Sequence, residues 1–467
     1  MKDKIKIAYI GGGSKMWARV FMNDLALIKG LSGEIALYDI DIAAAERNRK
    51  IGGYINQNKN TVSKWNYVVC KELKDALTGA DFVVLSILPG TFDEMESDVH
   101  MPERYGIYQS VGDTVGPGGV LRAMRTVPIY EGFAREIATY CPKAWVINFT
   151  NPMTICTKTI FDVFPEAKAF GCCHEVFHAQ EFLSCVASEE LGVPRPDRHE
   201  IGIDASGVNH FTWITEANYK GVDLMKLLPE YIEKHFEKGV LEKKGVPYAD
   251  LHSADPFTYG NKVKMDLFMR YGALAAAGDR HLVEFVDNEW YLKDPETVEK
   301  WLFHLTTVDY RKRNCANLIA ESELLASGKK PVTVSASDEE ATILMQAILG
   351  KGKVVSNVNM PNRGQMPDMP LGTIVETNCV FDGDSVKPVV ANPLPRAVQA
   401  LVYRNAMNIE TCYHGIKTRN LDEIFASFLN QPLCSHLSVD DARTLFKDMV
   451  NATSPYLKDY YNLGELK

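Results

Sequence analysis

The chain has 467 residues, which is too many for one ordinary hydrophobic core and favours two closely packed domains. Hydrophobic residues make up 46% of it and charged residues 24%, a composition typical of globular proteins that excludes an intrinsically disordered chain. The formal net charge is -9 and the basic residues are dispersed, which argues against a nucleic-acid partner. The sequence contains no run of about 18 apolar residues, so no membrane span is predicted.

The first residues and the cysteines suggest a compartment. The opening stretch MKDKIKIAYIGGGS lacks the apolar region and cleavage site of a secretory signal. The ten cysteines are scattered without any C-x-x-C pair, as is typical of buried thiols in large cytosolic enzymes. We therefore expect a cytoplasmic protein.

The N-terminal residues alternate predicted strands and helices. Residues 4–10 (KIKIAYI) form a β-branched alternating run, GGGS follows as a tight turn, and residues 15–30 place apolar side chains at helical spacing. Residues 34–41 predict a second strand, with a helix beginning near Ala43, and residues 81–89 (DFVVLSILP) predict a third. Nearly continuous apolar runs are typical of parallel strands covered on both faces.

Further predicted strands at 144–152 and 167–173 continue this alternation. Residues 1–195 are therefore predicted to form a doubly wound, Rossmann-like parallel sheet that binds NAD, an α/β fold. The segment 192–200 is rich in proline and charge and marks a boundary, beyond which residues 196–467 are predicted to be a second, α+β domain for substrate and metal. In that part, antiparallel strands, a mainly helical stretch, more strands and a helical tail succeed one another.

The glycine turn predicts a dinucleotide site. Gly11, Gly13 and Ser14 lie where a strand passes into a helix, so that a pyrophosphate can approach the backbone amides, although Met16 replaces the third glycine of the usual G-x-G-x-x-G. Asp39 ends the second strand, 26 positions after Gly13, where an acid binds ribose hydroxyls and disfavours a 2'-phosphate. NAD is therefore predicted over NADP, with Asp41 as the alternative ribose ligand.

Three polar clusters lie in apolar surroundings, where buried polar groups need partners or a task. They are Cys172, Cys173, His174 and Glu175 in GCCHEV; Asn209 and His210 in SGVNHFTW; and Asp279, Arg280, His281 and Glu284 in AGDRHLVEF. A thiolate and an imidazole can hold a divalent metal with positions open for substrate, and ligand softness favours zinc. The alternative is a buried core thiol beside a histidine bonded to the backbone.

Five stretches together carry a resemblance to a known family. They are IAYIGGGS, SVGDTVGPGGVLRAMR (110–125), NFTNPM (148–153), GCCHEVFH (171–178) and GVNHF (207–211). In this order, over nearly the whole chain, they resemble glycoside hydrolase family 4, the NAD- and metal-dependent glycosidases, whose architecture is similar to that of lactate and malate dehydrogenases. In that family the tetrapeptide at the metal cysteine tracks substrate, and CHEV resembles the subgroup that acts on α-galacturonides.

The resemblance implies roles for individual residues. Cys173 and His210 match the family's metal ligands, and the family uses manganese rather than zinc. Asn148 matches the asparagine close to the nicotinamide, and Asn151 matches the one that contacts sugar hydroxyls. Asp113 lies where many members have a glutamate before GPGG, on the substrate side.

The family mechanism is a redox-assisted elimination, not the two-carboxylate hydrolysis of other glycosidases. NAD takes a hydride from C3 of the sugar, a base removes the C2 proton, the C1 group leaves, water adds and the hydride returns. Some members use a tyrosine as the C2 base, but GDRHLVEF contains none. Asp279 is the candidate base here and His281 the second, with a structural pairing of Asp279 as the alternative.

Acid and substrate contacts complete the expected site. His174 is the candidate acid for the leaving oxygen, with Glu175 as its rival. Arg280 is the candidate partner of a uronate carboxylate, and Arg122 or Arg363 are alternatives.

Other functions remain compatible with the sequence. They are a related glycosidase acting on α-glucosides, α-galactosides or α-glucuronides; an NAD-dependent hydroxy-acid or sugar dehydrogenase; and a non-catalytic binding protein for NAD or sugar. For the glycosidase the partner is a small uronate glycoside, and the resemblance implies a homodimer or homotetramer.

Overall fold

A computed structural model describes residues 4–250 and 255–465. The first part of the chain builds six parallel strands in the order β3-β2-β1-β4-β5-β6, which is the doubly wound order of dinucleotide-binding folds. The strands are β1 (Lys4–Ile10), β2 (Ser32–Tyr38), β3 (Trp65–Cys70), β4 (Phe82–Leu85), β5 (Trp145–Asn148) and β6 (Lys168–Gly171). The predicted Rossmann-like sheet is confirmed.

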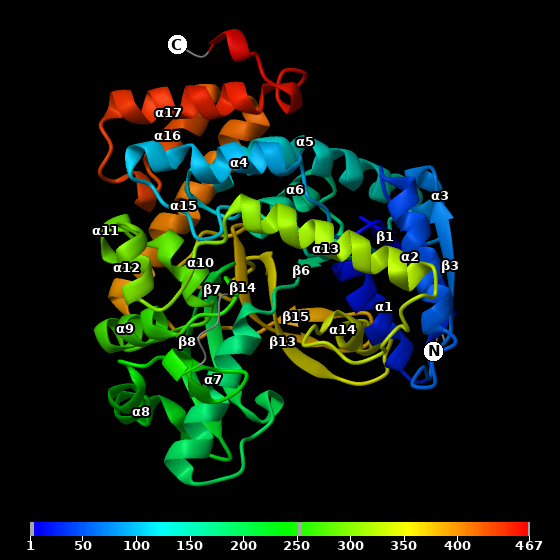
Figure 1. Ribbon diagram of the computed structural model, residues 1–467, viewed down its shortest axis with the longest axis horizontal. Helices are drawn as coiled ribbons and strands as arrows, with labels where there is room; N and C mark the ends of the chain where they lie inside the picture. Colours follow the sequence, from blue (N-terminus) through cyan, green and yellow to red (C-terminus); the bar gives the residue numbers. More distant parts are fainter. Residues whose placement is uncertain (1–3, 251–254, 466–467) are drawn as a thin grey trace.

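The helices of this part alternate with the strands and cover both faces of the sheet (Figure 1). They are α1 (Trp17–Leu27), α2 (Ile42–Ile55), α3 (Leu73–Leu77), α4 (Phe92–His100), α5 (Gly116–Tyr140), α6 (Met153–Val163) and α7 (Glu175–Leu191). Local sequence fixes several ends: Thr91 and Glu94 form a capping box at the start of α4, and Gly192 adopts a left-handed conformation at the end of α7.

One strand was missed from the sequence. The run predicted as the third strand, 81–89, is β4, because β3 (WNYVVC) precedes it. This strand pairs only with β2 at the edge of the sheet, and its side chains alternate between buried and more exposed positions. Its apolar run, residues 67–70, is shorter than the nearly continuous run at 81–89 by which β4 was recognised.

The sheet continues into the second part of the chain, and the described residues form one mixed sheet of 13 strands. β6 pairs antiparallel with β13 through Asn359 and Gly171, and β14, β7, β8 and β12 follow. The later strands are β7 (Gly202–Val208), β8 (Phe211–Tyr219), β9 (Val222–Asp223), β12 (Leu274–Ala275), β13 (Val354–Pro361), β14 (Ile374–Phe381) and β15 (Val386–Pro388), with β10 (Val240–Leu241) and β11 (Val246–Pro247) as a separate pair. The domain boundary at 195/196 stays a prediction, since the sheet runs across it.

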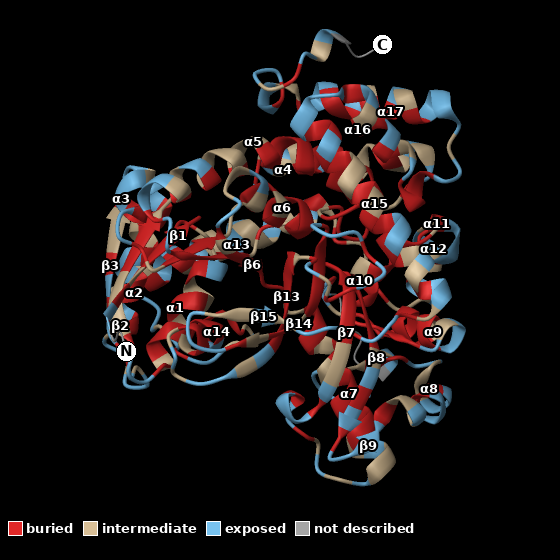
Figure 2. Cartoon of the chain, turned by 180° about the vertical axis from the view of Figure 1, so that it is seen from behind, coloured by how far each residue is buried: buried red, intermediate tan, exposed pale blue. Residues whose placement is uncertain are grey.

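Later helices also cover the first part. α13 packs against α2, and α14 packs against α1 and supplies buried side chains to the same core as β1 (Figure 1). The helices after α7 are α8 (Leu228–His235), α9 (Lys262–Tyr271), α10 (Asp279–Leu282), α11 (Asn288–Tyr291), α12 (Pro295–Lys300), α13 (Val308–Ala326), α14 (Ala341–Ile348), α15 (Arg396–Thr418), α16 (Leu421–Leu429) and α17 (Val439–Ala452). Figure 2 shows that the central strands are buried while the outer helices turn exposed faces to solvent.

Two consequences follow for function. In the described part of the chain, no helix combines the length and apolar character needed to cross a membrane. The carboxyl ends of β1, β4, β5 and β6 lie at one edge of the parallel sheet, where doubly wound folds bind their ligands.

Candidate active site

The turn after β1 requires its glycines. Gly11 has φ +98°, and a Cβ atom there would lie 1.9 Å from the carbonyl oxygen of Ser86. A Cβ on Gly12 or Gly13 would lie 2.8 Å from Leu37 or Ala44. The turn therefore packs tightly against the segments around it and requires glycine, as the phosphate-binding turn of dinucleotide-binding folds does.

The first turn of α1 is free of competing side chains. Its N-cap, Met16, makes no side-chain capping bond, and the first turn contains no acid. The amide groups that begin a helix are left for an anion in such a case. This arrangement fits the diphosphate of a dinucleotide.

Asp39 lies beside the turn. Its Oδ2 accepts a hydrogen bond of 2.8 Å from the Gly13 amide and its Oδ1 one of 2.9 Å from the Asp41 amide, which leaves lone pairs for ribose hydroxyls. Asp41 instead accepts from Ala44 N at 3.0 Å and caps α2. The geometry favours Asp39 over Asp41 as the ribose ligand.

His210 occupies the turn between β7 and β8 with φ +64° and is buried. Its Nδ1 lies 2.9 Å from the hydroxyl of Thr114, which donates its own proton to Asp113 Oδ1 at 2.7 Å. The hydroxyl must therefore accept from Nδ1–H, so that the lone pair of His210 is on Nε2. Burial, together with nearby His281, lowers the pKa of His210 to about 3 and keeps the ring neutral, the form that binds a metal.

His210 belongs to a compact group of possible ligands. One ligand atom from each of Asp113, His210 and His281 lies within 4.8 Å of the other two, and the two imidazole rings have centroids 3.8 Å apart. Burial opposes ionisation of Asp113, but Arg122, His281 and His210 together hold its pKa well below the ordinary value. A carboxylate and a neutral imidazole suit a divalent cation such as manganese.

Asn151 joins this group from the loop after β5. Its Nδ2 donates to Asp113 Oδ2 at 3.4 Å, while its Oδ1 is buried and has no hydrogen-bond partner. A buried amide oxygen without a partner is one that a ligand hydroxyl can satisfy. The predicted sugar contact at Asn151 fits this geometry.

Cys173 is buried at the end of β6, and burial, with Glu376 and Glu175 nearby, raises the pKa of its thiol well above the ordinary value. Among the described residues, its sulfur is not part of either compact group of possible metal ligands. His210 lies in the group with Asp113 and His281, without Cys173. Cys172, next to it, packs in the hydrophobic core below the sheet, as expected.

His174 and Glu175 begin α7 and form a second group with His178. His174 Nδ1 lies 3.0 Å from Glu339 Oε1, and this contact outweighs burial and raises the pKa of the imidazole. Glu175 accepts from the Gly278 amide at 2.6 Å, and the histidines around it overcome burial and hold its pKa well below the ordinary value. Glu175 is thus an ionised carboxylate, which disfavours it as the acid.

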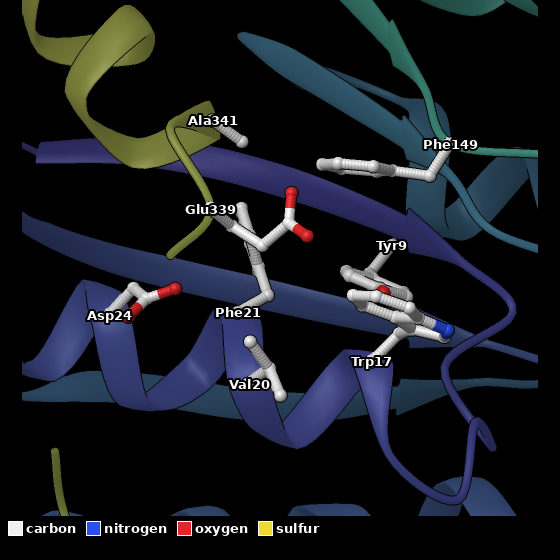
Figure 3. A pocket seen from close by; sticks show the side chains of 8 residues that line it. All are labelled: Tyr9, Trp17, Val20, Phe21, Asp24, Phe149, Glu339 and Ala341. Atoms are coloured by element: carbon white, nitrogen blue, oxygen red, sulfur yellow. The ribbon is translucent and has the colours of Figure 1, made fainter. Parts of the chain in front are cut away.

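Figure 3 shows an apolar pocket beside this group. Its lining residues come from β1, α1, the loop after β5, the segment before α14 and the first residue of α14: Tyr9, Trp17, Val20, Phe21, Asp24, Phe149, Glu339 and Ala341. The carboxylate of Glu339 points into it, and Glu339 Oε2 has no hydrogen-bond partner. Glu339 connects the pocket to His174, on which Trp17 stacks with ring centroids 6.1 Å apart.

Comparisons with known proteins show the family of the chain. The family model described as Family 4 glycosyl hydrolase matches residues 6–189. The model of the family's C-terminal domain matches residues 205–434. The chain belongs to glycoside hydrolase family 4.

Two similar proteins, an α-galacturonidase and a putative glucosidase, match this chain over nearly their full length. An α-galacturonidase of Thermoanaerobacterium saccharolyticum is 48% identical over 453 residues, 97% of this chain and 96% of its own. The crystal structure of a putative glucosidase, lplD, of Bacillus subtilis is 45% identical with a TM-score of 0.90, covering 96% of this chain and all of that one.

More distant structures share the fold. A Thermotoga maritima 6-phospho-β-glucosidase, solved with manganese, NAD⁺ and glucose-6-phosphate, is 18% identical with a TM-score of 0.73 over 97% of this chain and 99% of its own. A Plasmodium falciparum malate dehydrogenase is 14% identical with a TM-score of 0.50 over 90% of this chain and 99% of its own. The expected likeness to malate dehydrogenase architecture is confirmed.

Two residues of the predicted site make structural contacts in this chain. Asp279 is fully buried, and its carboxylate accepts from Val263 N at 3.2 Å and Lys264 N at 3.0 Å, at the start of α9. This is a structural pairing, with backbone amides and not with an arginine, and it favours the structural alternative for Asp279 over the role of base.

Asn148 is likewise occupied. Its Oδ1 accepts from Tyr130 OH at 2.6 Å and from Thr150 N at 3.1 Å, and its Nδ2 donates to the Thr150 carbonyl. The side chain is fully buried. These bonds shape the loop that carries Asn151, and the place of Asn148 beside the nicotinamide stays a prediction.

Some residues of the site were not found from the sequence. Thr114 follows Asp113 in a quoted stretch, yet nothing local indicates that it orients His210. Glu339 comes from a loop far along the chain and reaches His174 only in the fold. Arg363, an alternative for the uronate, is exposed, whereas Arg280 and Arg122 are buried near Asp113.

Proposed function

We propose that this chain hydrolyses α-galacturonides with the help of NAD and a divalent metal ion, manganese. The observation that carries the proposal is the 48% identity, over 97% of the chain, to a protein named as an α-galacturonidase. The tetrapeptide CHEV and the neutral His210 beside Asp113 support it. NAD preference over NADP rests on Asp39.

When bound, NAD supplies reversible oxidation at C3, and the metal draws electron density from the C2 and C3 oxygens and so acidifies the C2 proton. His210 and Cys173 would hold the metal, with Asp113 within reach of the same position. Asn151 Oδ1 accepts a hydrogen bond from a sugar hydroxyl. These residues set the ring in place for proton transfer.

His281 is the base that the geometry favours. Its Nδ1 is buried without a hydrogen-bond partner and can accept a proton. Its Nε2 carries the ring proton and lies 3.8 Å from Oε1 of the ionised Glu175. Such a carboxylate stabilises the imidazolium that forms when Nδ1 takes the C2 proton. The lone pair on Nδ1 cannot also bind the metal. His281 is therefore either the base or a metal ligand, and not both.

His174 is the proposed acid. Glu339 orients its ring through Nδ1, which leaves Nε2 to donate a proton to the oxygen that departs from C1. The expectations of a homodimer or homotetramer and of a cytoplasmic location accompany this proposal. Light scattering on the purified chain tests the first of them.

Release of p-nitrophenol from matched α-galacturonide, α-glucuronide and α-galactoside substrates tests the function. We expect cleavage of the galacturonide only with both NAD and Mn²⁺, and no accumulation of NADH. Cleavage of another glycoside would keep the mechanism and change the substrate. Steady NADH formation on free uronate without cleavage would identify a dehydrogenase.

The metal ligands are tested separately. Cys173→Ser and His210→Asn should each lose activation by Mn²⁺, with kcat/KM reduced at least about 100-fold, and should still bind NAD. Asparagine is chosen because it tolerates the left-handed backbone of His210. Cys315→Ser, on α13 and only partly buried, is the control. Unchanged Mn²⁺ activation in Cys173→Ser would remove that residue from the metal site.

A further inference from the structure

Three arginines around the candidate site lack carboxylate partners. Arg122 on α5, Arg280 on α10 and Arg311 on α13 are not paired with any carboxylate oxygen within 4.0 Å in the described residues. One turn further along α5, Arg125 forms the opposite case, because both of its terminal nitrogens bond to Asp98. The three unpaired guanidinium groups therefore differ from an arginine that serves structure alone.

Neutral groups hold two of these arginines side by side. Arg280 Nη2 donates to the hydroxyl of Thr306 at 2.6 Å, and Arg311 Nε donates to the carbonyl of the same residue at 3.3 Å. Arg311 Nη2 also donates to the Val111 carbonyl at 3.0 Å. These bonds fix the positions of both guanidinium groups without neutralising their charge.

Arg280 has unused donor capacity. It is only 6% exposed, its Nε is buried without a hydrogen-bond partner, and its guanidinium carbon lies 4.7 Å from the centre of the Phe257 ring. A buried cation with an unpartnered N–H is costly unless an anion completes it. The unpartnered group thus indicates a ligand.

The acids nearby are committed elsewhere. Asp113 accepts from Thr114 and Asn151. Glu284 accepts from the amides of Val111 at 2.7 Å and Gly112 at 2.9 Å, and burial raises its pKa to about 7. Asp113 and Glu284 act on Arg280 and Arg311 only at longer range, and in the described residues neither acid forms a direct ion pair with them.

We propose that Arg280 and Arg311 together bind the carboxylate of the galacturonate ring, and that Arg311 is a specificity-determining residue. The proposal rests on the proposed function and adds a residue to it. The planar forks of two guanidinium groups match a carboxylate, whereas the hydroxymethyl group of a neutral hexose carries no charge to pair with them. Arg122 has another task, because its Nε donates to the Asn151 carbonyl at 3.0 Å and so positions the loop that contacts the sugar.

Binding of free galacturonate and of its neutral methyl ester to the protein loaded with NAD and Mn²⁺ tests this assignment. In Arg311→Gln we expect the dissociation constant of galacturonate, measured by calorimetry, and KM for an α-galacturonide to rise roughly 10- to 100-fold. The constant for the methyl ester should change less than about 2-fold, because the ester makes no charge-assisted bond. Arg311→Lys should recover part of the loss, since it restores the charge without the fork.

Arg313→Gln is the matched control, because Arg313 lies on the same helix but is 71% exposed and pairs with Asp309. Thermal unfolding of each variant separates loss of fold from loss of binding. Equal losses for acid and ester in folded Arg311→Gln, or no loss for the acid in both Arg311 variants, would overturn the assignment. If the wild type cleaves no galacturonide, the proposed function fails, but the contrast between acid and ester still tests the arginines.

Discussion

The glycine turn after β1 and the histidine group around His210 are built on different principles. The turn uses consecutive residues, Gly11 to Ser14, and what matters there is the absence of side chains. The histidine group draws Asp113, His210 and His281 from three distant segments, and what matters is how each side chain is partnered. The first region depends on backbone space and the second on burial and hydrogen bonding.

The difference shows in how each region tolerates change. A substitution at Gly11 must displace backbone, because the nearest atom to an added Cβ is the carbonyl oxygen of Ser86. A substitution in the histidine group can leave the fold intact and still remove the chemistry.

Gly11→Ala should have the largest effect on stability. The added Cβ would lie 1.9 Å from Ser86 O in a backbone conformation that alanine rarely adopts, so β1 and the residues after β4 must move apart. We expect a loss of roughly 3 kcal/mol or more in the free energy of unfolding, measured by urea denaturation, together with loss of NAD binding.

Gly53→Ala is the control for this substitution. Gly53 lies within α2, has no atom within 4 Å of an added Cβ and does not require a positive φ. Alanine there should leave stability unchanged or raise it by about 0.5–1 kcal/mol. A destabilisation of similar size at both glycines would show that space around Gly11 is not the cause.

The same difference explains what the sequence could predict. The strands β1, β2, β4, β5 and β6 and the glycine turn were recognised because their signals lie within a few neighbouring residues. The edge strand β3 was missed because its apolar run, residues 67–70, is short. The sharing of one sheet by both parts could not be predicted, since the pairing of Asn359 with Gly171 joins segments far apart in the chain.

The candidate site was predictable only in part. His210, His281, Asp113 and Asn151 were named from their motifs and do lie close together. The partners of Asp279 and Asn148 were not predictable, because an acid or amide in a motif looks the same whether it meets a ligand or a backbone amide. Arg311 has no motif, and its contacts with Thr306 and Val111 exist only in the fold.

Asp279→Asn sharpens the comparison inside the second region. The carboxylate accepts from two backbone amides at the start of α9, whereas the amide of asparagine places a donor where one acceptor is needed. We expect a loss of about 1–3 kcal/mol in the free energy of unfolding with kcat within about 3-fold of the wild type at a temperature where the variant is folded. His281→Gln should show the reverse, with kcat reduced at least about 100-fold and little change in stability. A large fall in kcat for Asp279→Asn with unchanged stability would restore Asp279 as the base.

His199→Gln should give the smallest effect and extends the comparison to a histidine outside the site. His199 is 56% exposed and lies 2.6 Å from Asp197 Oδ1 and 3.3 Å from Glu340 Oε1. The bond to Glu340 raises the pKa of His199 despite partial burial, and the reciprocal bond, with Ser356 and Arg198, outweighs burial and lowers the pKa of Glu340.

The stability from this pair has a defined pH window. The stability that His199 contributes is fully present below its unfolded pKa of 6.5 and is lost as pH rises through its raised folded pKa. The stability that Glu340 contributes is present above its unfolded pKa of 4.5 and is lost as pH falls through its lowered folded pKa. Solvent screening limits the contribution to a fraction of a kcal/mol. The difference in Tm between wild type and His199→Gln should therefore peak between these values and vanish in alkaline buffer, and a difference that persists there would show that packing, not charge, is responsible. His210 cannot contribute in this way, because its buried ring stays neutral through the same range.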